Sequence, residues 1–291
     1  MSHSASLPDS EAGGPSGSAD ATAATQAGGF DERRFTGVAR LYGEQGLARL
    51  RAARVCVIGL GGVGSWAAEA MARNAVGGMV LVDMDHIAPS NANRQIHALG
   101  ETFGMAKTAA MARRIADINP ECRVETTEDF VTIDNVKDIM PRGCDVVVDA
   151  IDQANAKAAL TSWCKRSGVP LITCGSAGGK LDPTRVRISD LNRTEQEPLL
   201  AKVRDILRRH YGFPRGPKPR YDIAAVYSDE PLLRPEEATE SGIQGINCAG
   251  YGSSVSVTAS FGFAAAAWAI RRIVEQARPR EACELPEAWP Y

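Results

Sequence analysis

The stretch VCVIGLGGVGSW, residues 55–66, constrains the fold of this chain more than any other segment. A run of β-branched residues precedes a glycine-rich turn, and the helix-favouring segment SWAAEAMAR follows it. This order predicts a β-strand that leads through a tight turn into an α-helix. Glycines let the backbone approach a phosphate closely, and the helix N-terminus offers unpaired N–H groups. We therefore expect phosphate binding by Gly59, Gly61, Gly62 and Gly64.

Strands and helices are expected to alternate after this turn. The pattern predicts strands at 54–58, 79–83, 123–127, 145–150 and 170–174, and helices at 64–75, 105–118, 132–140 and 153–167. This alternation is typical of an α/β fold with a Rossmann-like, doubly wound, mainly parallel sheet. Ligands of such sheets bind outside the carboxyl ends of the strands.

One large domain is expected, because 291 residues with 44% hydrophobic and 23% charged side chains suffice for a full core. We place this domain at 30–276, with short helices within 30–53 and a C-terminal extension packed on the sheet. The Ser-, Ala- and Gly-rich residues 1–29 are expected to be a disordered tail. The Pro- and Glu-rich residues 277–291 are expected to be a loose tail.

Basic residues gather in one part of the chain, although the net charge is only −2. Residues 180–220 hold eleven Lys or Arg against five Asp or Glu. Within an expected basic insertion at 180–245, this excess indicates either a surface for a polyanion or the solvated face of a helix at 193–211.

Cysteine usage and the N-terminal composition favour the cytoplasm. The seven cysteines include no C-x-x-C pair, and residues 1–29 show no secretory signal. The uncharged segment 255–270 is compatible with a membrane anchor over 253–270, but its Ala-rich middle and internal glycines favour a buried helix.

Two acidic residues follow the second predicted strand. Asp83 lies 24 residues after Gly59, the spacing at which an acid binds ribose hydroxyls in NAD or ATP sites. Asp85 is the second candidate for this role.

Arginine and lysine in SNANRQ (90–95) and GMAK (104–107) separate ATP from NAD. A triphosphate that loses pyrophosphate needs cations beside the departing group, whereas a bound dinucleotide does not usually need both. Arg94 and Lys107 are therefore the expected catalytic cations, and Ser90 and Asn91 are expected to contact the nucleotide.

Carboxylates end the fourth predicted strand, VVVDAID (146–152). Asp152 is placed where it can hold Mg²⁺ between phosphates, which would make it a catalytic and metal-binding residue. The alternative is that Asp152 caps the next helix.

These motifs together resemble the ubiquitin-activating-type family of ATP-adenylating enzymes, which includes activators of thiamin and molybdopterin sulfur carriers. GLGGVG, DMD, SNANRQ, GMAK and DAID carry the resemblance over residues 34–180. The flanks RFTGVARLYGEQG, TCGSAGGKLDPT and NCAGYGSSVSVTASFGF are similar to the branch that dehydrates threonylcarbamoyladenosine beside the tRNA anticodon.

The resemblance implies ATP and Mg²⁺ as cofactors and cyclisation of this tRNA nucleoside through an acyl-adenylate. It also implies a homodimer and admits a sulfur acceptor or cysteine desulfurase system as partner, with Cys248 as a candidate nucleophile. Zinc is not expected, because the family's C-x-x-C pairs are missing. The alternatives are an adenylating activator of a ubiquitin-like sulfur carrier, a nicotinamide-dependent oxidoreductase and an inactive scaffold.

Overall fold

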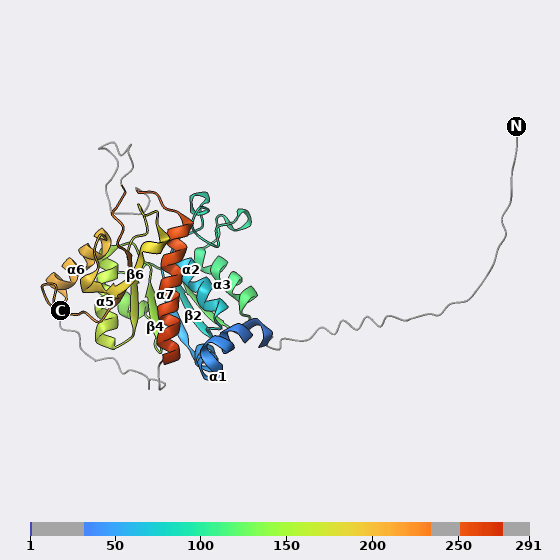
Figure 1. Ribbon diagram of the computed structural model, residues 1–291, viewed down its shortest axis with the longest axis horizontal. Coiled ribbons are helices and arrows are strands. Elements are labelled where there is room, and N and C mark those ends of the chain that lie inside the picture. The colour runs from blue at the N-terminus through green and yellow to red at the C-terminus, as the bar shows by residue number, and fades with distance from the viewer. Residues whose placement is uncertain (2–31, 234–250, 276–291) are drawn as a thin grey trace. The chain divides into compact units, whose positions relative to one another are not determined.

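The computed structural model describes residue 1, residues 32–233 and residues 251–275. In this part of the chain, seven strands form one sheet in the order β3-β2-β1-β4-β5-β7-β6 (Figure 1). The strands are β1 Arg54–Ile58, β2 Gly78–Val82, β3 Arg123–Thr127, β4 Val146–Asp149, β5 Leu171–Cys174, β6 Val186–Asp190 and β7 Ala224–Ser228. Neighbouring strands are parallel except β6 and β7, which are antiparallel. The predicted doubly wound, mainly parallel fold is confirmed.

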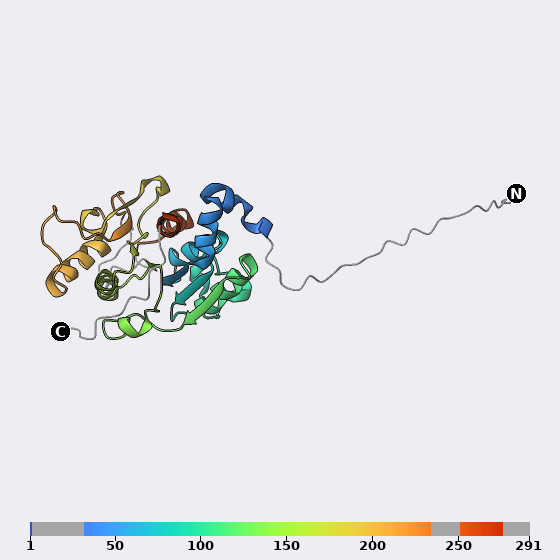
Figure 2. The same ribbon diagram turned by 90° about the horizontal axis from the view of Figure 1, so that it is seen from below.

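Helices cover both faces of the sheet (Figure 2). One face packs against α1 Thr36–Ala52, α2 Gly64–Arg73, α3 Lys107–Ile118 and α7 Val255–Glu275. The other face packs against α4 Val136–Ile139, α5 Ala154–Ser167 and α6 Pro198–His210. Short 3-10 helices lie at η1 Glu32–Phe35, η2 Pro89–Asn91, η3 Gly100–Thr102, η4 Pro183–Arg185 and η5 Leu191–Arg193.

The central strands are apolar throughout because both of their faces are buried. Val55 and Val57 of β1 enter the core beneath α2 and α7, whereas Cys56 and Ile58 enter the core beneath α5 and α6. Alternate residues of a strand point to opposite faces, so a sheet covered on both sides needs continuous hydrophobic runs. This explains why β1, β2, β4 and β5 were identifiable in the sequence.

The segment after β5 was only partly predicted. The helix expected at 193–211 is present as α6, but the sequence pattern did not predict β6 and β7. Strand β6, VRISD, is an edge strand whose middle residues are exposed, so it lacks a continuous hydrophobic run. These two strands extend the main sheet, so the described part of 180–245 belongs to the body of the fold.

Helix α7 is the segment that sequence alone left open between a buried helix and a membrane anchor. It is long and apolar enough to cross a membrane, but 56% of its most apolar window is buried inside the protein. Val257, Phe261 and Ala265 join the core formed with α2 and the sheet. The expectation of a buried helix is confirmed.

A buried ion pair joins β4 to α5. Lys157 Nζ lies 2.9 Å from Asp149 Oδ1, and both side chains are fully buried. The second carboxylate oxygen of Asp149 accepts a hydrogen bond from Thr173 Oγ1 of β5 at 2.7 Å. Both charges are therefore compensated where the central strands end.

Removing one partner of this pair should be strongly destabilising. We expect Lys157→Met to lower the free energy of unfolding by about 3–5 kcal/mol, because Asp149 would remain buried without its cation. The double variant Asp149→Asn/Lys157→Met should lose less than Lys157→Met alone, measured by denaturant unfolding. Lys165 lies on the same helix as Lys157 and forms an exposed ion pair with Asp222. Lys165→Met removes this pair and should lower the free energy of unfolding by less than about 1 kcal/mol. If Lys157→Met and Lys165→Met lower the free energy of unfolding equally, the buried pair contributes no more to stability than the exposed one.

Candidate active site

A pocket opens at the carboxyl ends of β1, β2 and β4, where the strand order reverses. This is where parallel α/β sheets bind their ligands. Most of the residues expected to bind nucleotide line it, namely Gly59, Gly61, Gly62, Asp83, Asp85, Asn91, Arg94, Lys107 and Asp152. The structure thus brings together residues from five separate stretches of the sequence.

Some glycines of the turn line the pocket, whereas others are needed for close packing of the backbone. Gly59 has φ +83°, a left-handed conformation that favours glycine. Gly61 lines the pocket, and nothing lies within 4 Å of a Cβ built on it. A Cβ on Gly64 would lie 1.8 Å from the carbonyl oxygen of Gly59. Gly64 is not among the pocket-lining residues, so its absent side chain serves close packing of α2 against the turn.

Asp83 ties the glycine turn to the end of β2. Its Oδ2 accepts a hydrogen bond from the Leu60 N–H at 2.6 Å, and its Oδ1 accepts one from the Asp85 N–H at 2.8 Å. Burial raises the pKa of Asp83, while Lys107 and these two N–H groups act in the opposite direction. Carboxylate oxygens have further lone pairs, so Asp83 can also accept hydrogen bonds from ribose hydroxyls.

Lys107 lies against both acidic residues. Its Nζ is 2.7 Å from Asp85 Oδ2 and 3.7 Å from Asp83 Oδ1. Lys107 and Asp83 are largely buried, whereas 55% of the Asp85 side chain is exposed. Lys107 can therefore turn from Asp85 toward a bound phosphate without moving the more buried Asp83.

Arg94 is oriented by the backbone around it. Its Nη1 donates to the carbonyl of Ser90 at 2.9 Å, and its own carbonyl accepts a hydrogen bond from Trp66 Nε1 at 2.9 Å. Trp66 packs edge-on against Phe263 of α7 at 5.7 Å between ring centroids. Ser90 is exposed and does not line the pocket, so it contributes through its carbonyl group.

The two carboxylates of VVVDAID lie in different environments. Asp149 is the buried partner of Lys157, whereas Asp152 is exposed and lines the pocket. Gln153, not Asp152, occupies the N-cap position of α5, and no side chain caps that helix. Among the described residues, no group of three or more His, Cys, Asp and Glu side chains is arranged to hold a metal ion. Asp152 is an exposed pocket carboxylate, and carboxylate oxygens suit a Mg²⁺ ion that keeps phosphate and water as its other ligands.

Sequence reasoning missed the second side of the pocket. It is formed by Gly175, Ser176 and Ala177 after β5, by Leu199 of α6, and by Ser253 and Thr258 near the start of α7. The signals were the position of SAGG after the fifth strand, at the edge where ligands bind, and the flank NCAGYGSSVSVTASFGF, which contains Ser253 and Thr258. Cys248, the candidate nucleophile, lies outside the described residues.

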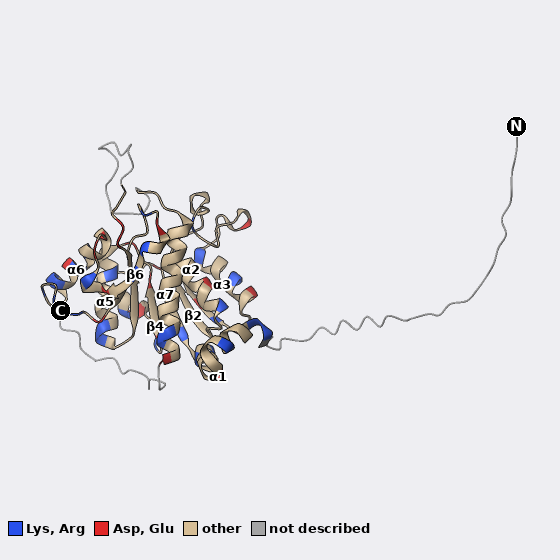
Figure 3. Cartoon of the chain, in the orientation of Figure 1, with Lys and Arg blue, Asp and Glu red and all other residues tan. Residues whose placement is uncertain are grey.

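Helix α6 carries several basic residues (Figure 3), and two of them, Arg204 and Arg208, form hydrogen bonds within the protein. Arg204 Nη1 donates to the Leu191 carbonyl and to Thr194 Oγ1. Arg208 donates to Tyr221 Oη at 2.8 Å and to Asn192 Oδ1 at 2.7 Å. These contacts hold α6 to its flanking segments, so the positive charge of 180–220 is only partly available to a polyanion.

His97 is buried close to the cations of the site. Neither ring nitrogen has a hydrogen-bond partner within the described residues. Burial lowers the pKa of His97 to about 4, and the charges of Lys107 and Arg114 act in the same direction. The imidazole is therefore neutral at physiological pH.

This histidine should make the protein acid-sensitive. As the pH falls from about 6.5 to about 4, His97 binds a proton in the unfolded chain but stays neutral in the folded protein. The free energy of unfolding therefore falls by up to about 3 kcal/mol over this range. We expect the free energy of unfolding of His97→Leu to depend less on pH over this range than that of the wild type, measured by urea unfolding at a series of pH values. The exposed His210 provides the control, and a curve unchanged by His97→Leu would contradict the assignment.

The two glycines of the turn should respond differently to a methyl group. Gly64→Ala should cost at least about 1–3 kcal/mol of stability, because its Cβ overlaps a backbone carbonyl. Gly61→Ala should keep the wild-type melting temperature and weaken ATP binding, because its Cβ enters only the pocket. Thermal melting and ATP titration test both, and equal melting temperatures would refute the distinction.

Similarity to known proteins agrees with this geometry. The tRNA threonylcarbamoyladenosine dehydratase of Haemophilus influenzae is 46% identical over 247 residues, which cover 84% of this chain and 93% of the relative. A crystal structure of the Escherichia coli enzyme with ATP matches with a TM-score of 0.77 and 45% identity, covering 83% of this chain and 94% of that one. The SAMP-activating enzyme E1 of Haloferax volcanii is 36% identical over 130 residues, covering 45% of this chain and 48% of the relative. Residues 34–285 match the ThiF family, and this chain belongs to that family.

Proposed function

We propose that this chain is an ATP-dependent dehydratase that cyclises threonylcarbamoyladenosine in tRNA. The observation that carries the proposal is the extent of the similarity to dehydratases. It covers more than four fifths of this chain and nearly the whole length of those enzymes. The sulfur-carrier alternative has less support, because the similarity to an enzyme of that kind covers about half of each chain.

The chemistry requires a carboxylate, ATP and no protein nucleophile. A carboxylate oxygen of the threonyl group attacks the α-phosphorus, pyrophosphate leaves and an acyl-adenylate forms. The neighbouring ureido group then attacks the activated carbonyl and AMP departs, so that the net change in the nucleoside is loss of water. Positioning and charge stabilisation supply most of the catalysis in such displacements.

The pocket residues provide for each need of this reaction. Asp83 binds the ribose hydroxyls, while Gly59, Gly61 and Gly62 let the phosphates approach the backbone. Arg94 and Lys107 stabilise the negative charge that gathers on pyrophosphate as it leaves. Asp152 would hold Mg²⁺, and the ion would supply further charge neutralisation at the phosphates.

We also propose a cytoplasmic homodimer. Val255 and Phe263 of α7 are 41% and 47% exposed, respectively, although the rest of that helix is rich in buried apolar residues. A second copy that covers this face would remove both from water. Sedimentation of the purified protein tests this arrangement.

The direct test is turnover of modified tRNA. Purified protein, ATP, Mg²⁺ and tRNA carrying threonylcarbamoyladenosine should yield AMP and a nucleoside lighter by one water, detected by mass spectrometry after digestion. ATP–pyrophosphate exchange that depends on a carrier protein with a Gly-Gly tail, and not on tRNA, would instead favour the sulfur-carrier activator.

Arg94→Ala should lower turnover more than ATP affinity. A charge aimed at a departing group acts mainly in the transition state, and its loss typically costs about 10²–10³ in rate. Single-turnover AMP formation and ATP titration measure the two effects. The exposed Arg113 provides a matched control, and wild-type turnover in Arg94→Ala would exclude this role.

Exposed cations of the basic segment should contribute to tRNA binding. Arg193 and Lys202 are exposed, and within the described residues no hydrogen bond or ion pair of either side chain is found. Replacing both with Gln should weaken tRNA binding and reduce its salt slope by about 0.7 for each phosphate that is no longer neutralised. Arg204→Gln/Arg208→Gln should mainly lower the melting temperature. If Arg193→Gln/Lys202→Gln binds tRNA with the wild-type affinity and salt slope, these two side chains do not contact the RNA.

A further inference from the structure

The second side of the pocket depends on a buried carboxylate that no nucleotide-binding motif includes. Glu197 directly precedes α6 and is 4% exposed. One of its oxygens accepts a hydrogen bond from the Ser176 N–H at 2.8 Å, and the other accepts one from the Leu200 N–H. One side chain thus caps α6 and fixes the segment that follows β5.

Glu197 also explains a glycine in the pocket wall. A Cβ on Gly175 would lie 2.7 Å from Cδ of Glu197, so any larger residue at 175 would displace the carboxylate. Burial raises the pKa of Glu197, whereas the N–H groups of Leu200 and Ser176 and the charge of Lys157 lower it. The donors therefore offset only part of the cost of burying this carboxylate.

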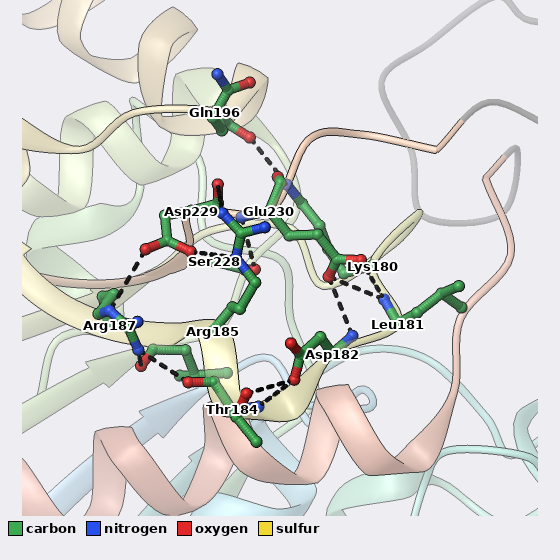
Figure 4. Close-up of polar contacts among 11 residues, drawn as sticks. Lys180, Leu181, Asp182, Thr184, Arg185, Arg187, Gln196, Ser228, Asp229 and Glu230 are labelled. Carbon is green, nitrogen blue, oxygen red and sulfur yellow. Dashed lines mark hydrogen bonds and ion pairs between the residues drawn. The ribbon is translucent and has the colours of Figure 1, made fainter.

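The backbone before Glu197 is held in an unusual conformation. Gln196 has φ +53°, a left-handed conformation that is uncommon for a residue other than glycine. Its carbonyl accepts a hydrogen bond from Lys180 Nζ at 3.0 Å, and Lys180 also donates to the Glu230 carbonyl (Figure 4). Lys180 is only 2% exposed. Such strain persists only where surrounding contacts maintain it, and it is frequent at functional sites.

Gly175, Ser176 and Leu199 line the same pocket as the nucleotide motifs. If ATP occupies the motifs, this second side is the part of the pocket wall that is free to receive the carboxylate that attacks the α-phosphorus. We propose that Glu197 is a positioning residue for the tRNA-borne carboxylate: it holds Gly175–Ser176 in place, and Lys180 directs it through the Gln196 carbonyl. This inference rests on the proposed function and adds to it the part of the pocket that receives the acceptor.

Glu197→Gln tests the proposal because an amide has only one acceptor oxygen. Its NH₂ group must face either the Ser176 N–H or the Leu200 N–H, and that donor loses its partner. We expect kcat/KM for modified tRNA to fall roughly ten- to a hundredfold, since small displacements of a reacting group have effects of this size. The dissociation constant of ATP should stay within about twofold of wild type. Glu197→Asp retains two acceptor oxygens and should restore most of the activity.

Asp190→Asn is the matched control. Asp190 is a buried carboxylate in the same region that accepts hydrogen bonds from the Asn192, Tyr221 and Asp222 N–H groups, and it does not line the pocket. This variant should lower the melting temperature and leave the tRNA kinetics of the folded enzyme unchanged. An equal loss of kcat/KM in Asp190→Asn and Glu197→Gln, or an equal loss of ATP affinity and tRNA turnover in Glu197→Gln, would overturn the proposal.

Lys180 and Gln196 provide an independent check. Lys180→Met removes the donor to the Gln196 carbonyl and should impair tRNA turnover in the same direction as Glu197→Gln. Full turnover of modified tRNA in Lys180→Met would refute the role of this hydrogen bond.

Hydrogen exchange separates this proposal from the proposed function. If the wild-type protein forms no AMP with modified tRNA, the proposed function fails. The positioning role is then decided by amide exchange in peptides that contain 175–177. Faster exchange there in Glu197→Gln, with unchanged ATP affinity and no such change in Asp190→Asn, supports it. Unchanged exchange at 175–177 in Glu197→Gln overturns it.

Discussion

The ion pair between Asp149 and Lys157 is the interaction on which the site depends. It lies at the end of β4, beside the reversal of strand order, and is wholly removed from water. Asp149 also accepts hydrogen bonds from Thr173 of β5 and from the Ile151 N–H that begins the pocket wall. A buried charge is tolerated only when it is paired and hydrogen-bonded. The same groups that satisfy Asp149 therefore set the spacing between the two strands that flank the pocket.

Charge balance also organises the nucleotide side of the pocket. Lys107 lies between Asp83 and Asp85, and Asp83 is bonded to the glycine turn through Leu60. These contacts keep the glycine turn, Asp83 and Lys107 in one arrangement without a ligand. Catalysis by charge stabilisation gains from groups that need not reorganise during the reaction. The exposed Asp85 is the partner that Lys107 can leave at least cost.

The C-terminal half of the chain completes the site from the opposite direction. Helix α7 supplies Thr258 to the pocket and packs Phe263 against Trp66, whose indole N–H bonds to the Arg94 carbonyl. Helix α6 reaches the pocket through Leu199, and Glu197, which precedes the helix, accepts a hydrogen bond from Ser176 in the pocket wall. Each helix joins the part of the chain after β5 to the nucleotide motifs or to the pocket wall. The part of the chain that carries the nucleotide motifs and the part after β5 are therefore packed together around the pocket.

The sequence by itself determined strands β1 to β5, the glycine turn and most of the motif residues that line the pocket, because these depend on local patterns. Continuous apolar runs indicate β1 and β4, and the local motif GLGGVG indicates the turn between a strand and a helix. Only the tertiary structure decided that Asp149 is a structural anion while Asp152 faces the pocket, since burial separates two acids that are three positions apart. It also decided that Arg204 and Arg208 stabilise α6, and that Glu197 meets Ser176. Such pairings join residues distant in sequence, and no local spacing or composition encodes them.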